Sequence, residues 1–210
     1  MLHKSINYSE YLKQIKSDGL CFGQSWLWMS EVMSGAKGSL IPPDFYKGEV
    51  IHNQYRAVTV STGDATFFLN QKISELKSRA PEKGLQEQRA NDYASSVKLV
   101  NALPASSSAN VAIIMSWGKN KEQSTLNKML CRYDSAHAMV LLKLKHNGKI
   151  YLFDPNEGVY EWVPESGVGL KTDVKRCLLK NTSSVMVAMR SATMLSTKSD
   201  ISLNFEHVMV

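Results

Sequence analysis

Three residues that lie far apart in the chain carry side chains able to act together on a carbonyl group: Cys21, His137 and Asp154. The sulfur of a cysteine attacks a carbonyl carbon once a base has taken its proton, and an imidazole is a common base for this step. A carboxylate bound to the second nitrogen of that imidazole fixes its tautomer and stabilises the imidazolium. The residue types therefore predict covalent catalysis through a thioester, with Cys21 as the nucleophile.

The segment around Cys21 predicts a helix that begins at this residue. Apolar and small side chains repeat at helical spacing over residues 21 to 34, and Gly35 follows, a residue type that commonly ends helices. A helix N-terminus and a neighbouring imidazolium both favour a thiolate over a thiol, which ordinarily loses its proton at about pH 8.5. We expect Gly23 to keep the first turn slim, so that a substrate backbone can approach the sulfur. The face that contains Cys21 also carries Ser25, Trp28, Met29 and Val32.

The dipeptide Asn147-Gly148, between two apolar runs, predicts a hairpin with a two-residue turn, because both residues tolerate positive φ. Such a turn places Asp154 opposite Leu141, on the same side of the sheet as His137. The aspartate and the histidine would then be about 13 Å apart along the strands, which is too far for a hydrogen bond. Either the loop is offset or bulged, or another residue orients His137.

Asn156 is the second candidate to orient His137, because an amide oxygen also accepts a hydrogen bond from an imidazole. The negative oxygen that forms during acyl transfer needs its own donors. We expect an oxyanion hole made of the backbone N–H of Cys21 and one side-chain donor just upstream. Gln14 is the nearest upstream amide, and Asn7 is the next.

The composition is that of an ordinary globular chain. It has 210 residues, of which 43% are hydrophobic and 21% are charged, enough for one domain with a sizeable core. No apolar stretch is long enough to span a membrane, and the N-terminus lacks the apolar segment of a Sec signal peptide. The net charge of +6 is spread along the chain, which predicts a solvated surface or attraction to an anionic membrane or an acidic partner. No motif indicates binding to nucleic acid, and none indicates an oligomeric state.

The remaining cysteines and histidines have simpler interpretations. The three cysteines are too few and too scattered for a disulfide framework, which favours a reducing compartment. No cysteine and histidine have zinc-ligand spacing, so we expect neither a metal nor a cofactor. Cys131 and Cys177 are predicted to be structural thiols. The other four histidines are predicted to lie at the surface: His3, His52, His146 and His207.

The periodicity changes near residue 104, and this change predicts an α+β fold. An N-terminal helical half, about residues 1 to 104, packs on an antiparallel sheet half, about residues 109 to 190, followed by an irregular tail over 191 to 210. Together they form a single catalytic domain over 1 to 210, with the active site in the cleft between the halves. Helices are predicted over 7–17, 21–34, 43–57, 64–79, 84–102 and 172–179, and strands over 110–117, 137–145, 149–154, 160–163 and 184–190.

At these residues the sequence resembles the YopT-type cysteine proteases, the YopT and AvrPphB group of bacterial virulence effectors with a papain-like fold. Residues 19 to 26, GLCFGQSW, resemble the family's Gly-x-Cys segment with a tryptophan soon after. The pair His137-Ala138 at the entry to an apolar strand resembles its histidine segment. Residues 153 to 158, FDPNEG, resemble its Asp-Pro-Asn block. The resemblance covers about residues 15 to 190.

This resemblance implies a cysteine endopeptidase with Cys21 as nucleophile, His137 as general base and acid, and Asp154 as the residue that orients His137. It also implies delivery by a specialised secretion system into a host cell, and cleavage of a host protein in the host cytoplasm at a membrane. Known members cut membrane-associated targets such as prenylated Rho-family GTPases, or a plant kinase. Because Rho tails are basic, the charge of +6 favours a different substrate or retention on an anionic membrane.

Two alternatives remain open from the residues alone. The same triad serves deamidases, transglutaminases, acyltransferases and cell-wall amidases, since all proceed through a thiolate and a thioester. A chain of this kind could also be a binding module that recognises a partner without catalysis.

Overall fold

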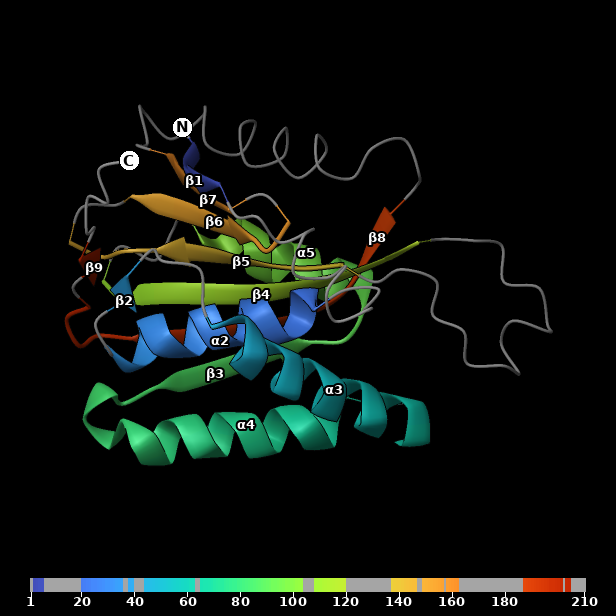
Figure 1. Cartoon of the computed structure of the whole chain (residues 1–210). Coiled ribbons are helices and arrows are strands. Elements are labelled where there is room, and N and C mark those ends of the chain that lie inside the picture. The colour runs from blue at the N-terminus through green and yellow to red at the C-terminus, as the bar shows by residue number, and fades with distance from the viewer. Residues whose placement is uncertain are drawn as a thin grey trace.

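The computed structural model describes residues 2–5, 20–35, 38–39, 44–62, 65–103, 108–119, 137–146, 149–156, 158–162, 187–201 and 203–204. This part of the chain is α+β: helices pack on a seven-stranded antiparallel sheet with the strand order β1-β7-β6-β5-β4-β8-β3 (Figure 1). None of the described helices combines the length and the apolar character needed to cross a membrane. That a single catalytic domain extends over 1 to 210 stays a prediction.

The helices are α2 (Cys21–Ser34), α3 (Phe45–Thr62), α4 (Thr66–Arg79) and α5 (Tyr93–Ala102), with a short 3-10 turn, η1, at Pro81–Lys83. The strands of the large sheet are β1 (Leu2–Ser5), β3 (Gln86–Ala90), β4 (Asn110–Lys119), β5 (His137–Lys143), β6 (Ile150–Asp154), β7 (Gly158–Trp162) and β8 (Val187–Thr197). A separate parallel pair joins β2 (Gly38–Ser39) to β9 (Leu203–Asn204).

Both faces of the sheet are covered, α2 lying on one face and α5 on the other (Figure 1). Alternate residues of a strand point to opposite faces, so each central strand contributes to two apolar clusters. Ala138 and Val140 of β5 belong to the cluster under α2, and Met139 belongs to the cluster under α5. Trp28 of α2 stacks on Phe153 of β6, with ring centroids 5.1 Å apart. Burial on both faces explains why β5 and β6 are almost continuously apolar in sequence.

The register of β5 and β6 differs from that of a two-residue turn at Asn147-Gly148. Phe153 pairs with Val140, and the backbone N–H of Leu144 donates to the carbonyl of Lys149 at 3.1 Å. A two-residue turn would instead pair Lys149 with His146, so this prediction is wrong. Four residues, 145 to 148, connect the paired positions, and 147 and 148 lie outside the described residues. The shift of two positions moves Asp154 closer to His137 along the sheet.

Helix α3 packs very closely on the first turn of α2, and glycines make this possible. A Cβ atom built on Gly23 would lie 1.9 Å from the carbonyl oxygen of Gly48 and 2.8 Å from the backbone nitrogen of His52. The rings of Phe22 and Tyr55 stack beside this contact, with centroids 3.8 Å apart. The space beside Gly23 is therefore occupied by α3, and the expectation that it admits a substrate backbone is wrong.

The segment 84 to 102 is not one helix. Gln86–Ala90 forms β3, which pairs antiparallel with β8, and only Tyr93–Ala102 is helical. Asp92 separates the two elements because its side chain accepts a hydrogen bond from the backbone N–H of Ser95 and caps α5. The polar segment of β3 carries no apolar periodicity, and its pairing with β8 overrides the helical preference of its residues.

The C-terminal part of the chain also differs from the sequence prediction. Strand β8 extends through Thr197, where an irregular tail was expected from Ser191, and Ala192, Thr193 and Leu195 are buried. Small and hydroxylated residues at these buried positions hide the strand pattern in the sequence. In addition, β1 and β3 come from the predicted helical half but belong to the sheet. The predicted helices over 7–17 and 172–179 lie outside the described residues.

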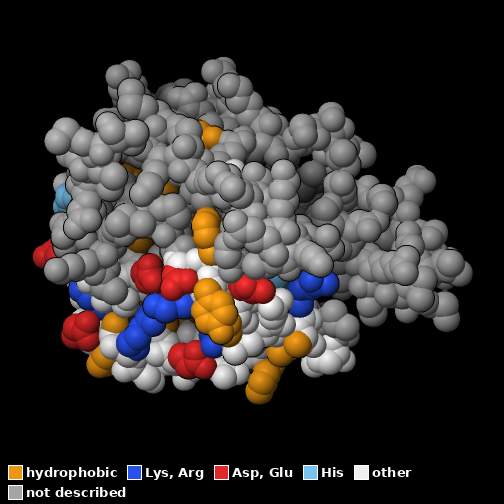
Figure 2. All heavy atoms as spheres, in the orientation of Figure 1, with side chains coloured by type: hydrophobic (Ala, Val, Ile, Leu, Met, Phe, Trp, Pro, Cys, Tyr) orange, Lys and Arg blue, Asp and Glu red, His pale blue; other side chains and the backbone are white. Residues whose placement is uncertain are grey.

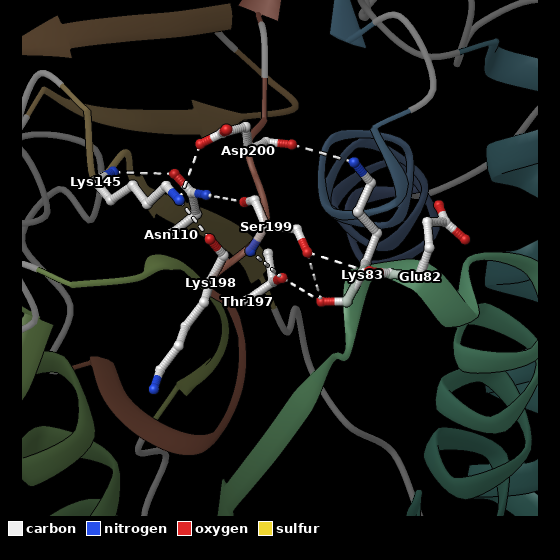
Figure 3. Close-up of polar contacts among 8 residues, drawn as sticks. All are labelled: Glu82, Lys83, Asn110, Lys145, Thr197, Lys198, Ser199 and Asp200. Atoms are coloured by element: carbon white, nitrogen blue, oxygen red, sulfur yellow. Dashed lines mark hydrogen bonds and ion pairs between the residues drawn. The ribbon is translucent and has the colours of Figure 1, made fainter.

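Figure 3 shows a polar network that joins the end of β8 to η1, β4 and the end of β5. Asn110 is fully buried, and its side chain accepts from the N–H of Lys145 at 2.9 Å and donates to the carbonyl of Ser199 at 2.8 Å. The ammonium of Lys145 also pairs with Asp200 at 2.9 Å. The Thr197 hydroxyl donates to the carbonyl of Lys83. This network fixes the turn that follows β8.

The surface drawn in Figure 2 mixes acidic and basic side chains over the described helices. On α4, Lys72 and Glu75 form an ion pair at 3.0 Å, one helical turn apart. Among the residues that the structure describes, three large hydrophobic side chains are exposed: Tyr46 and Val50 on α3 and Phe67 on α4. The described part of this face therefore offers no continuous basic stripe.

Candidate active site

Cys21 is the first residue of α2, and its sulfur sits where the helix presents its positive end. The preceding residue, Leu20, supplies no side-chain cap, and the first turn holds no acidic residue. The first N–H groups of a helix have no partner within the helix and carry a partial positive charge. Cys21 is only 9% exposed.

His137, the first residue of β5, lies between the carboxylate and the thiol. Its Nε2 atom is 3.0 Å from Oδ1 of Asp154, and its side chain also forms a hydrogen bond with Cys21. Since Nε2 faces the carboxylate, Nδ1 is the nitrogen left for the sulfur. The His137 side chain is 22% exposed and that of Asp154 is 2% exposed. The structure thus brings together all three residues that the sequence singled out.

The surroundings of His137 determine its charge. Burial opposes the charged form and by itself would lower the pKa of this imidazole. The hydrogen bonds with Asp154 and Cys21, together with the negative charges of these two groups, outweigh burial and raise the pKa to about 10. His137 is therefore an imidazolium at neutral pH, ready to give a proton.

Asn156, the alternative partner of His137, contacts the site through its backbone. The N–H of Asn156 donates to Oδ1 of Asp154 at 2.9 Å, the same oxygen that accepts from His137. Asn156 itself is exposed. The carboxylate is thus held by the turn that follows β6. In this arrangement Asp154 is the partner of the imidazole, and Asn156 positions Asp154.

Of the groups predicted to form the oxyanion hole, only the backbone N–H of Cys21 belongs to the described residues. Gln14 and Asn7 lie outside the described residues. The backbone N–H of Cys21 belongs to the first turn of α2, and N–H groups in the first turn of a helix can bind an anion.

One histidine predicted at the surface is partly buried instead. His52 of α3 packs beside α2, and burial, with a smaller contribution from the charge of Arg56, lowers the pKa of His52 to about 4. Its Nδ1 atom is buried without a hydrogen-bond partner among the described residues. His52 is thus neutral at physiological pH.

The sequence pattern places Ser25 on the same helical face as Cys21 but indicates no role for it at this site. The Ser25 hydroxyl donates to the carbonyl oxygen of Ala138 at 2.9 Å, and Ser25 is fully buried. The sequence signal that relates Ser25 to the site is its spacing of four residues from Cys21, which places both on one face of a helix. No sequence pattern could reveal that the acceptor is the residue next to His137.

No known protein family matches the sequence, and a search of curated proteins finds no relative. Among solved structures, the crystal structure of the Pseudomonas avirulence protein AvrPphB is similar to this chain, with a TM-score of 0.47 and 13% sequence identity. The similarity covers 87% of this chain and 93% of that one.

Proposed function

We propose that this chain is a papain-like cysteine endopeptidase that acts through Cys21, His137 and Asp154. The observation that carries the proposal is the position of His137, which contacts Asp154 at 3.0 Å and Cys21 at the start of a helix. A nucleophile, a base and an orienting carboxylate in this relation are what acyl transfer requires. The substrate would enter a cleft between the helices and the sheet, because Cys21 comes from α2 and His137 from β5.

In the proposed reaction the thiolate of Cys21 attacks the carbonyl carbon of a peptide bond, and the carbonyl oxygen becomes an oxyanion. The backbone N–H of Cys21 and the side chain of Gln14 would stabilise this oxygen. The intermediate collapses to a thioester as the C–N bond breaks, and the imidazolium of His137 gives its proton to the departing amine. Water then attacks the thioester while His137 takes a proton from it. Release of the carboxylic acid restores the thiolate and the imidazolium.

We further propose that the substrate is a host protein, such as a membrane-associated GTPase or a kinase. The chain would be delivered by a specialised secretion system and would act in the host cytoplasm at a membrane. The support for this part is the resemblance of the segments around Cys21, His137 and Asp154 to YopT-type proteases. The net charge of +6 is compatible with retention on an anionic membrane.

The first test measures the chemistry without knowledge of the substrate. The rate of alkylation of Cys21 by iodoacetamide is followed against pH, and labelled peptides are resolved by mass spectrometry to separate Cys21 from Cys131 and Cys177. A thiolate held by an imidazolium reacts well below about pH 7, where an ordinary thiol is almost inert. His137→Gln is expected to remove this reactivity at acidic pH. Equal pH profiles for wild type and His137→Gln would contradict the proposal.

The second test addresses the reaction itself. Host-cell lysate is treated with wild-type protein or with Cys21→Ala, and new protein termini are compared by mass spectrometry. Fragments that depend on Cys21 are the expected result. A mass increase of about one dalton without a cut, or a new covalent adduct, would instead show that the same thioester serves deamidation or transfer.

A further inference from the structure

Ser25 makes a hydrogen bond that joins the element of the proposed nucleophile to the element of the proposed base. Its hydroxyl donates to the carbonyl of Ala138 at 2.9 Å, and no part of Ser25 is exposed. Ser25 stands four residues after Cys21, one turn further along the same face of α2. Ala138 directly follows His137 in β5.

The end of the β5–β6 pairing explains why a side chain is needed at this point. The pairing of β5 with β6 begins at Val140, so Ala138 lies two residues before it. At this end of the strand β5 retains its pairing with β4, through Ser116 and Ala138. The Ser25 hydroxyl therefore adds a contact from the helix to the portion of β5 that extends past β6.

This hydrogen bond also restricts the distance between the sulfur and the imidazole. Its two ends are one helical turn from Cys21 and one residue from His137. A buried hydrogen bond tolerates little variation in length or angle, so it limits sliding of α2 along β5. Misplacement of catalytic groups by about 1 Å can lower a rate by roughly two orders of magnitude.

We propose that Ser25 is a positioning residue, which holds the start of α2 against the start of β5 and so sets the contact between Cys21 and His137. This inference rests on the proposed function of Cys21. It gives Ser25 no chemical step of its own. The role is distinct from general support of the core, because its effect should appear in the charge state of the Cys21–His137 pair.

The chain provides a matched control on the same helix. Ser30 is also buried, at 4% exposed, and its hydroxyl donates at 2.9 Å to the carbonyl of Leu27 within α2. Ser30→Ala removes a hydroxyl of similar burial and bond length without affecting the link between helix and sheet. Ser25→Thr and Ser25→Val form a second pair of variants. Their side chains have nearly the same shape, but only threonine keeps the hydroxyl. This pair keeps the test usable if Ser25→Ala does not fold.

The experiment measures the pH profile of Cys21 alkylation by iodoacetamide in full-length folded protein, with thermal unfolding followed in parallel. For Ser25→Ala we expect the midpoint of the profile to move upward by about one pH unit, and the rate at acidic pH to fall roughly tenfold. Ser30→Ala should leave the profile unchanged, even where it lowers the melting temperature. Ser25→Thr should react more like wild type than Ser25→Val does.

The outcomes separate the two proposals. An acid-reactive thiol in wild type with the same profile in Ser25→Ala, or the same profile for Ser25→Thr and Ser25→Val, overturns the role of Ser25 and leaves the proposed function standing. An ordinary thiol profile in wild type overturns the proposed function and the role of Ser25 with it.

Discussion

His137 reaches Asp154 at 3.0 Å across two neighbouring strands although the two residues are not register partners. Because Phe153 pairs with Val140, Asp154 stands opposite Met139, two positions from His137. Diagonal neighbours of this kind in an antiparallel pair have Cα atoms about 7 to 8 Å apart, a gap that an imidazole and a carboxylate can bridge. The contact is thus a property of the register and of the four-residue connection after Leu144.

Asp154→Asn is expected to leave the fold intact and to impair the site. An amide can still accept a hydrogen bond, but it lacks the negative charge that helps to raise the pKa of His137. Catalytic turnover should fall by roughly two to four orders of magnitude, and Cys21 alkylation at acidic pH should slow. Asn156→Ala is the control, because it retains the backbone N–H that contacts Asp154. An equal loss in both variants would show that the turn matters as a whole and the carboxylate does not.

The stability of the fold should depend on pH through His137. The pKa of this histidine is raised from 6.5 to about 10, so its protonated form stabilises the folded state. That contribution is fully present below pH 6.5 and is lost as the pH rises toward about 10. The unfolding free energy of wild type should therefore exceed that of His137→Gln most at low pH, and the difference should shrink with rising pH in urea titrations.

Gly23→Ala is expected to destabilise the protein by about 3 kcal/mol or more, since the new methyl group would collide with backbone atoms of α3. Gly84→Ala serves as the comparison. Gly84 has a φ of +55° and open space around a built Cβ, so only backbone strain opposes that change. A cost of about 1 to 2 kcal/mol is expected there. Urea unfolding measures both, and equal costs would argue against the close packing of α2 on α3.

Asn110→Ala should cost about 3 kcal/mol, because it leaves the N–H of Lys145 and the carbonyl of Ser199 without this buried partner. Asn70→Ala, which removes an exposed acceptor of Arg89, should change stability by about 0.5 kcal/mol or less. In the folded Asn110→Ala protein, the pH profile of Cys21 alkylation should match wild type. A changed profile would mean that the network of Figure 3 and the site are coupled.

The sequence could predict the elements that carry the site because each has a strong local signal. Helix α2 spans Cys21–Ser34, as its periodicity and the following glycine indicate, and Gly35 adopts a φ of +68° that favours glycine. Strands β5 and β6 are apolar runs that begin or end within two residues of the predicted bounds, β5 at Lys143 in place of 145 and β6 at Ile150 in place of 149. Their buried residues alternate between the cluster under α2 and the cluster under α5, as expected for strands.

Features set by contacts between distant segments could not be predicted in this way. The polar residues of β3 become a strand because β8 lies beside them, and the hydrogen bond of Ser25 depends on which strand packs under α2. The register of β5 and β6 is a further case, because a dipeptide that tolerates positive φ does not fix the length of its loop. Local sequence preference predicts the type of an element correctly where tertiary contacts favour the same structure. At β3, at Ser25 and in the β5–β6 connection, tertiary contacts decide the structure instead.

Cys21 belongs to α2, while its partners belong to β5 and β6, more than a hundred residues later in the chain. Contacts between such distant segments form late in folding because closing a long loop costs conformational entropy. On the proposed mechanism, a nascent or partly folded chain carries an ordinary cysteine until the centre of the sheet is complete. The chain would then be inactive during its own synthesis. In a refolding experiment, the time at which Cys21 becomes reactive at acidic pH would report when the last contacts of the fold form.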